Sequence, residues 1–245
     1  MLTLRNLQAG YDGCTALHGV SVVVEDQSIT GIVGPSGAGK TTLANCICGY
    51  VPAIAGQIFL EDRHIAQRPA SERLMRGIAC VPAARRLFPD MSVLENLQLG
   101  AADSAASKAR RQFDFALSVF PELKPHLRES AGGLSLCLQR VLMFARALMS
   151  APRLLILDQP SYGLSGEQAQ KLTRTIPRLI GDQLTSILLL EQNLFHAVKV
   201  ADVVYRMTKG RITGKHSGLE LLAHPTLQSE FLRGALQPSA EAMVL

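Results

Sequence analysis

The sequence predicts an α/β fold with a parallel-sheet core, an antiparallel β edge at its N-terminus and a helical insertion. Three runs dominated by apolar residues, Ile29–Val33, Leu154–Asp158 and Ser186–Leu190, are typical of strands buried on both faces of a parallel sheet. The first part of the chain instead alternates apolar and polar side chains, as strands with one exposed face do. A long segment with helical periodicity precedes the second buried run.

The N-terminal edge is expected to contain short antiparallel strands at Leu2–Leu4 and Val20–Val24, with a turn near Gly10–Gly13. The first buried run leads into a glycine-rich loop, after which a helix is expected to begin at about Lys40. This succession of strand, loop and helix is the start of the parallel core. Further short strands are expected at Ile58–Leu60 and Ile78–Val81.

The helical insertion is expected to cover about residues 92–149. Breaks are expected at Pro121–Pro125 and at the pair Gly132-Gly133, because proline and glycine are poor helix formers. No internal repeat or low-complexity tract interrupts the chain, so residues 1–237 are predicted to form one domain. Residues 238–245 carry no motif and are predicted to be a flexible tail.

Composition narrows the classes of function. The chain has 245 residues, of which 47% are hydrophobic, enough for a sizeable buried core. No stretch reaches the about 18 consecutive apolar residues of a membrane span, so any membrane role is expected to come through a partner. The five cysteines lack metal-ligand spacing, which argues against a zinc site. The net charge of +5 comes from scattered basic residues without interleaved aromatic residues, and nucleic acid is not an expected partner.

The glycine-rich loop carries the most specific motif in the chain. Its sequence GPSGAGKT matches the phosphate-binding pattern G-x-x-x-x-G-K-[ST] at every fixed position, between an expected strand and an expected helix. Glycines let backbone N–H groups point at phosphate oxygens, and the lysine reaches the β- and γ-phosphates of a nucleotide. The residues expected to hold these phosphates are Gly34, Ser36, Gly37, Ala38, Gly39, Lys40, Thr41 and Thr42.

A bound nucleotide needs a carboxylate for its metal ion, and the second buried run supplies one. Asp158 ends this run at the expected carboxyl edge of the sheet, where it can ligate Mg²⁺ together with the Thr41 hydroxyl. An aspartate at a strand end also commonly caps a turn, but metal binding is favoured when a phosphate-binding loop precedes it in the same chain. The expected cofactors are ATP and Mg²⁺.

With these two motifs in place, the chain resembles ABC ATPases over roughly Leu2–Leu232. In detail it resembles the shorter ATP-binding subunit of branched-chain amino acid and amide uptake transporters. Three stretches carry the finer resemblance: CVPAARRLFPDMSVLENLQLG (80–100), RALMSAPRLLILDQPSYGL (146–164) and LLLEQNLFHAVKVAD (188–202). The last is the most discriminating, because that subfamily is similar in having EQN where other ABC ATPases carry a His-containing motif.

The resemblance implies a subunit that couples ATP binding and hydrolysis to import. It would lie peripherally at the cytoplasmic face of the membrane, attached to integral permease subunits and served indirectly by a solute-binding protein. It also implies head-to-tail pairing with a second ABC ATPase subunit, each ATP lying between one subunit's phosphate loop and the other's signature segment. Tyr11 would stack on adenine; an aromatic residue can also be a core residue, but its place beside a turn favours stacking.

Two departures from the family pattern concern catalysis directly. The signature that the family writes as LSGGQ or LSGGE reads Leu134-Ser135-Leu136-Cys137-Leu138 here, which leaves Ser135 as its donor and puts Leu136 where close backbone approach is needed. Gln159 stands where the family places a glutamate that acts as general base. An amide cannot take that proton, although it can orient water. A natural change and a change introduced to trap ATP both fit this substitution.

Two further departures concern the loops beside the nucleotide. Ala83 occupies the position of a Gln or Glu that contacts magnesium and water, and Gln192 occupies the switch position usually held by His. The Gln192 change resembles the subfamily's own habit. Gln159 and Gln192 are therefore the expected catalytic positions, and hydrolysis by the isolated chain is expected to be weak. A homodimer would carry each fault twice, which favours a heterodimer with a more complete ATPase subunit.

The sequence leaves two alternative functions open. One is a nucleotide-binding regulatory or structural subunit with little turnover, which Gln159 and the missing signature glycines favour. The other is a non-transport ABC ATPase that acts on nucleic acid or ribosomes. A single nucleotide domain without a long coiled coil argues against the second.

Overall fold

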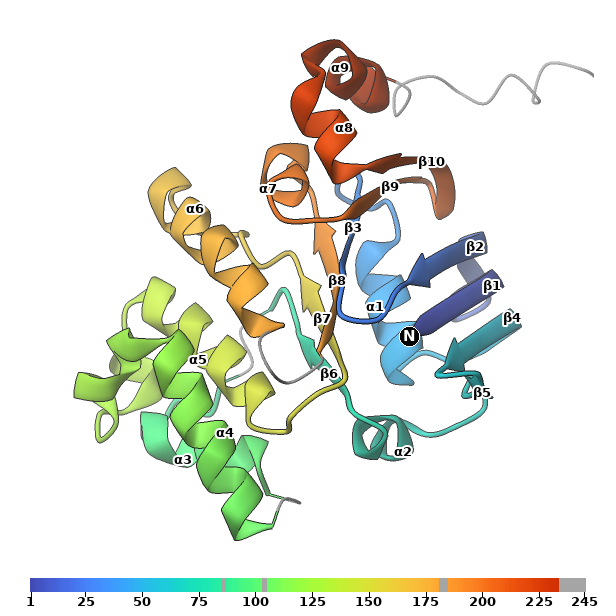
Figure 1. Ribbon diagram of the computed structural model, residues 1–245. Coiled ribbons are helices and arrows are strands. Elements are labelled where there is room, and N and C mark those ends of the chain that lie inside the picture. Colours follow the sequence, from blue (N-terminus) through green and yellow to red (C-terminus); the bar gives the residue numbers. More distant parts are fainter. Residues whose placement is uncertain (85–86, 103–104, 181–184, 234–245) are drawn as a thin grey trace, which may run out of the picture.

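The chain forms two β-sheets and a lobe of helices (Figure 1). This computed structural model describes residues 1–84, 87–102, 105–180 and 185–233. The larger sheet runs through the centre, with the helical lobe on one side and helix α1 (Lys40–Cys48) and the smaller sheet on the other. The predicted fold class is confirmed in its three parts: a parallel core, an antiparallel edge at the N-terminus and a helical insertion.

The smaller sheet is antiparallel. In spatial order its strands are β2 (Cys14–Val24), β1 (Leu2–Tyr11), β4 (Ala53–Leu60) and β5 (Arg63–His64). The first three are longer than the sequence predicted. Register shifts along β1 after Leu4 interrupt the alternation of apolar and polar residues, and Asn6 lies there in a left-handed conformation. The periodic signal is therefore lost although the strands continue.

The larger sheet has six strands among the described residues. In spatial order they are β10 (Arg211–Ser217), β9 (Val203–Thr208), β3 (Ile29–Val33), β8 (Ser186–Glu191), β7 (Leu154–Asp158) and β6 (Ile78–Val81). The pairs from β9 to β6 are parallel, whereas β10 is antiparallel to β9. The sequence pattern predicted neither β9 nor β10. No side chain of β10 is fully buried, so its membership of the sheet depends on main-chain pairing.

Alternate side chains of the central strands serve two different cores. On β7, Leu155 and Leu157 belong to the cluster on the helical side, whereas Leu154 and Ile156 belong to the cluster that contains α1 and the antiparallel sheet. Because both faces are covered, these strands read as continuous apolar runs. This burial also places the carboxyl ends of β3, β7 and β8 next to one another at one edge.

The helical lobe contains α3 (Val93–Gly100), α4 (Ala106–Val119) and α5 (Leu136–Leu148). Two 3₁₀ turns, Pro121–His126 and Ala131–Gly133, lie at the proline and glycine breaks that the sequence indicated. The rings of Phe120 and Phe144 pack edge to face in its core, with centroids 6.1 Å apart. This packing fixes α5, whose first turn carries the signature segment.

The remaining helices of the described residues lie around the larger sheet (Figure 1). They are α2 (Ala70–Met75), α6 (Gly166–Thr175) with the 3₁₀ turn Ile176–Leu179, α7 (Leu194–Val198), α8 (Gly218–Ala223) and α9 (Pro225–Arg233). None of the helices within the described ranges is long and apolar enough to cross a membrane. The predicted tail, residues 238–245, lies outside the described residues.

Candidate functional site

The loop between β3 and α1 brings the predicted phosphate-binding residues together at the edge of the sheet. A Cβ on Gly34 would lie 2.1 Å from the main-chain oxygen of Met207, so this position excludes every side chain. Gly39 is the N-cap of α1 and has a φ of 104°, which favours glycine. The loop thus has the close approach and backbone freedom of a phosphate cradle at a helix N-terminus.

Lys40 is buried at the first position of α1, with 3% of its surface exposed. Its Nζ donates hydrogen bonds to the carbonyl oxygens of Gly34 (2.7 Å) and Pro35 (2.8 Å). Burial lowers the pKa of Lys40, and the nearby carboxyl groups of Asp158 and Glu191 oppose that shift. The ammonium group is therefore positioned at the mouth of the loop, where a phosphate would be a stronger partner than neutral carbonyls.

Asp158 lies at the carboxyl end of β7 and is almost fully buried. Burial raises the pKa of its carboxyl group, against which act hydrogen bonds from the Thr41 hydroxyl and the Ala83 N–H and the charges of Lys40 and Arg140. Its Oδ1 is buried and accepts no hydrogen bond from the described residues. An unsatisfied carboxylate oxygen beside a threonine hydroxyl fits Mg²⁺, which prefers hard oxygen ligands. Thr41 and Asp158 are the residues that would hold it.

Gln159 and Gln192 line one pocket of about 520 Å³ on the same edge. Gln159 has a φ of 48°, and its N–H donates to the Leu190 oxygen at 2.8 Å, which ties it to β8. Gln192 follows β8 directly, with its side chain exposed. The structure thus brings both predicted catalytic positions together, and both carry neutral amides.

Glu191, the last residue of β8, was not among the residues predicted from the sequence. It is 2% exposed and lines the pocket of Gln159 and Gln192. Burial raises its pKa, while hydrogen bonds from Ser161 and the Gln192 N–H and the charge of His196 lower it. A signal for Glu191 was present: a carboxylate ends this apolar run just as Asp158 ends its own.

The signature segment lies on the other face of the larger sheet from the phosphate loop. Ser135 is the N-cap of α5, and its Oγ accepts a hydrogen bond from the Leu138 N–H at 3.3 Å. Leu136 is 50% exposed at the first position of the helix. The residues of α5 pack in the core on the helical side, whereas those of α1 pack in the other core. Within one chain, Ser135 is therefore not brought to Lys40.

Tyr11 ends β1 beside the turn that leads into β2. Its side chain is 46% exposed, and its hydroxyl accepts a hydrogen bond from Asn45 Nδ2 on α1 at 3.1 Å. It is therefore a surface aromatic residue linked to the phosphate-loop helix, not a core residue. The stacking of Tyr11 on adenine stays a prediction.

Comparison with known proteins assigns the family. Residues 17–162, more than half of the chain, match the model of the family described as ABC transporter. The chain belongs to the ABC transporter family. ABC ATPases bind and hydrolyse ATP, and the phosphate loop described above is the part of the chain equipped for that binding.

Among its ABC transporter relatives, the chain is 37% identical to the high-affinity branched-chain amino acid transport ATP-binding protein BraG of Pseudomonas aeruginosa, covering 96% of this chain and 100% of BraG. It is 35% identical to a probable branched-chain amino acid transport ATP-binding protein, LivF, of Archaeoglobus fulgidus, covering 91% and 95%. The lipopolysaccharide export system ATP-binding protein LptB of Escherichia coli is 30% identical, covering 94% and 96%. The recognition of an ATP-binding subunit of an ABC transporter is thus confirmed.

Solved structures agree with the assignment of this ABC subunit. The ADP conformation of MJ1267, an ATP-binding cassette of an ABC transporter, superposes with a TM-score of 0.81 at 25% identity, covering 95% of this chain and 98% of MJ1267. A structure described as the ATP binding subunit of an ABC transporter superposes with a TM-score of 0.82 at 23% identity. The second likeness shows the fold alone.

A second residue that the sequence did not reveal is Arg140, on the helix that follows the signature. Its guanidinium group is buried and donates to the carbonyl oxygens of Pro82 (3.2 Å), Ala83 (3.1 Å) and Tyr162 (3.1 Å). Ala83 therefore contributes through its main chain, as a donor to Asp158 and an acceptor from Arg140. No local motif could have indicated Arg140, because its partners lie far away in the sequence.

Proposed function

We propose that the chain is the ATP-binding subunit of an importer for branched-chain amino acids or related amides. The observation that carries this substrate class is the identity of 37% to BraG, which covers 96% of this chain. The EQN stretch at 191–193 supports it, because the resembling subfamily carries the same residues where other ABC ATPases have His. Nucleotide would occupy the loop before α1, with Tyr11 against the adenine ring and Mg²⁺ on Thr41 and Asp158.

Hydrolysis by the isolated chain is proposed to be weak. Gln159 cannot accept a proton from water, and loss of a general base lowers a rate by about 10²- to 10⁴-fold. Leu136 presents a branched side chain, half exposed, where a close backbone donor is needed. The same two observations favour the second candidate, a regulatory ABC subunit that closes on ATP with little turnover.

The assembly proposed is a heterodimer with a second ABC ATPase subunit. Because the phosphate loop and Ser135 lie on different faces of the larger sheet, one chain cannot complete a nucleotide site with both. Each site would then take its signature from the other subunit. A more complete partner would supply its own signature to Lys40 and its own general base to the opposite site.

An integral permease subunit is proposed to dock in an apolar groove between α2, α3 and α5. The groove has a volume of about 690 Å³, and its lining includes Leu74 on α2, Leu99 on α3 and Met143 on α5. Tyr50 and Phe88 at the groove are 69% and 51% exposed. Exposed apolar side chains around one groove are typical of a protein interface. Docking there would hold this chain peripherally at the cytoplasmic face, with the solute-binding protein contacting only the permease.

The experiment that tests this function is reconstitution with the cognate permease and ATPase subunits in proteoliposomes. Uptake of radiolabelled leucine, isoleucine or valine driven by ATP is the expected result, and transport of none of these or of small amides would contradict it. Leu74→Glu combined with Phe88→Glu should abolish copurification with the permease and leave ATP binding intact. Leu219→Glu is the matched control, since Leu219 is 77% exposed on α8, outside the groove lining.

A further inference from the structure

The segment that follows Asp158 lies between two buried side chains of opposite charge. This segment, Gln159–Leu164, is called here the post-strand loop, and it joins β7 to the residues before α6. It begins in a left-handed conformation at Gln159 and is closed by an internal hydrogen bond from the Tyr162 N–H to the Gln159 oxygen, 3.0 Å. The loop carries one of the two amides beside the proposed γ-phosphate position.

Glu191 holds the loop from the side of β8. Its Oε1 accepts the Ser161 N–H at 3.2 Å, and its Oε2 accepts the Ser161 hydroxyl at 2.9 Å. The same Oε2 accepts the Gln192 N–H at 3.2 Å. One buried carboxyl group therefore joins the post-strand loop to the switch position, and three donors satisfy it there.

Arg140 holds the next residue of the loop from the side of the helical lobe. Its Nη2 donates to the Tyr162 oxygen at 3.1 Å, while its Nη1 donates to the Ala83 oxygen, also at 3.1 Å. Ala83 in turn donates its N–H to the Asp158 carboxyl group. A single guanidinium group thus links α5 both to the post-strand loop and to the residue that touches the proposed metal ligand.

We propose that Arg140 and Glu191 are positioning residues that clamp the post-strand loop so that the site reads the γ-phosphate of ATP. This inference rests on the proposed nucleotide site at the phosphate loop. Lys40 lies within electrostatic reach of both Asp158 and Glu191, so the charge that distinguishes ATP from ADP enters beside the clamp. Moving the loop would remove both Ser161 donors from Glu191 and the Tyr162 oxygen from Arg140, and the loss of hydrogen bonds to buried charged groups is unfavourable. The clamp therefore transmits the nucleotide state to α5, which begins at the signature segment.

The test measures how well the chain distinguishes the two nucleotides. Calorimetry would give the affinities of wild type, Glu191→Gln and Arg140→Met for Mg-AMP-PNP, a non-hydrolysable analogue of ATP, and for Mg-ADP. Each variant should bind the analogue about tenfold more weakly, the effect expected for losing a hydrogen bond to a charged group, and should bind Mg-ADP with unchanged affinity. The double variant should lose less than the product of the single losses, because both residues hold one loop.

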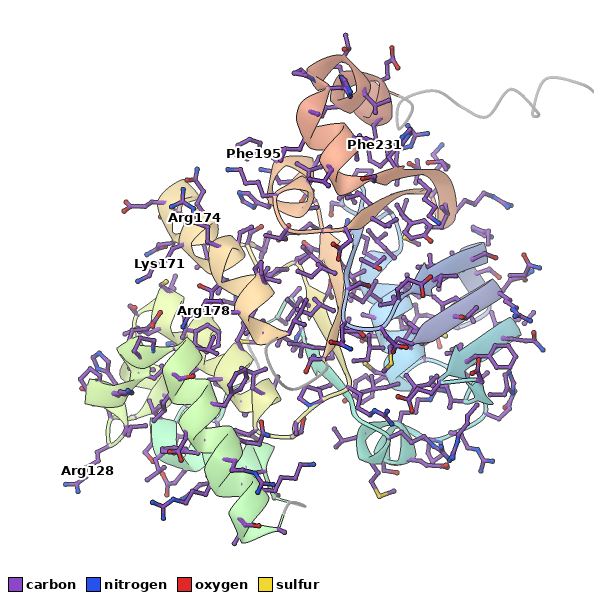
Figure 2. All side chains as sticks on the ribbon, in the orientation of Figure 1. Arg128, Lys171, Arg174, Arg178, Phe195 and Phe231 are labelled. Atoms are coloured by element: carbon purple, nitrogen blue, oxygen red, sulfur yellow. The ribbon has the colours of Figure 1, made fainter. Side chains whose placement is uncertain are left out.

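Matched controls are Glu167→Gln and Arg174→Met, which remove the same charges from exposed positions on α6. Figure 2 shows Arg174 on the outer side of this helix. Both controls should bind the two nucleotides as wild type does. Should the buried variants fail to fold, Ser161→Ala removes only the hydroxyl donor and should shift the ratio of the two affinities in the same direction.

An unchanged ratio of the two affinities in the clamp variants overturns the proposal. This holds whether both affinities fall together, as a purely structural role would cause, or neither changes. The nucleotide site is tested separately by Lys40→Ala. If that variant loses both nucleotides while the clamp variants keep the wild-type ratio, the clamp fails and the nucleotide site stands.

Discussion

Two helix N-termini in this molecule differ in the backbone conformation of their N-caps and in their capacity to bind an anion: Gly39 is left-handed, with a φ of 104°, whereas Ser135 has a φ of −58°. α1 begins after a glycine loop, with Gly39 as N-cap and the Lys40 side chain folded over the loop. α5 begins after Ser135, whose own hydroxyl accepts the Leu138 N–H, and Leu136 is half exposed in the first turn. The helix dipole favours an anion at each of these two N-termini.

The difference shows that an accessible backbone, rather than the dipole, decides which terminus can hold a phosphate. In the loop before α1, a Cβ on Gly37 would meet nothing within 4 Å, so the backbone there is open to a ligand. At α5 the first helical residue is a half-exposed leucine, Leu136, and the Ser135 hydroxyl already accepts one of the N–H groups, that of Leu138. The first terminus is the proposed phosphate cradle, and the second is a self-capped helix. Three experiments test this contrast, and a fourth tests the neighbouring carboxyl group of Glu191.

The largest expected effect is on the rate of ATP hydrolysis. It is expected when glycines are restored to the signature segment at the start of α5 and a glutamate is restored at position 159. Leu136→Gly with Cys137→Gly, or Gln159→Glu alone, should raise steady-state ATPase activity little. Combining them should exceed the product of the single gains, since residues of one catalytic unit are non-additive, and a general base alone accounts for about 10²- to 10⁴-fold. Robust turnover by the unmodified homodimer, or full rescue by Gln159→Glu alone, would contradict the account of both faults.

The second largest effect is expected on nucleotide affinity at the N-terminus of α1. Lys40→Ala should weaken Mg-ATP binding by about 100-fold, about 2.7 kcal/mol, because it removes a charge-assisted hydrogen bond to phosphate. Lys171→Ala, at an exposed position on α6, is the control and should bind as wild type in the same calorimetric titration. Equal affinities of wild type and Lys40→Ala would mean that the nucleotide lies elsewhere.

A smaller effect is expected at the cap of α5. Ser135→Ala should lower the free energy of unfolding by about 1 kcal/mol, which corresponds to about 2–4 °C in Tm, because the Leu138 N–H loses its acceptor. Mg-ATP affinity of the single chain should not change, since α5 and the phosphate-loop helix α1 pack in different cores. Ser118→Ala on α4, where the hydroxyl bonds to its own helix, is the control for thermal melts. A loss of affinity would place Ser135 at the nucleotide of its own chain.

The smallest effect is a dependence of stability on pH. Burial raises the pKa of Glu191 above its ordinary value of 4.5, so the native state holds this proton more tightly than the unfolded state. The resulting stabilisation is present below the ordinary pKa and is lost as pH rises through the raised one. The free energy of unfolding of the nucleotide-free wild type, relative to Glu191→Gln, should therefore fall from about pH 4.5 towards neutrality.

Urea denaturation of the two proteins at matched pH measures this difference. Lys40 and His196 interact electrostatically with Glu191 and can titrate themselves. The free energy of unfolding of wild type is therefore compared with that of Glu191→Gln at each pH, and not with its own value at another pH. A difference that rises with pH would show that the three donors to Glu191 outweigh its burial. Glu191 would then stabilise the fold as well as clamp the loop.

The sequence by itself determined the elements whose signals are local. Consecutive residues were enough to predict the phosphate loop, Asp158 and the buried strands. A motif of fixed spacing, or a strand covered on both faces, can be recognised without knowing its distant partners. The family resemblance came from the same continuous stretches. Glu191 could also have been predicted from the sequence, since it is a carboxylate at a strand end, as Asp158 is.

Only the tertiary structure decided which distant residues meet. β10 is held by main-chain pairing rather than by buried side chains, so its composition carries no strong pattern. Arg140 reaches Ala83 and Tyr162 only because the helical lobe packs against the end of the parallel sheet. The separation of Ser135 from Lys40 likewise follows from the two faces of that sheet. Contacts of this kind depend on the packing of whole elements, and no spacing along the chain encodes them.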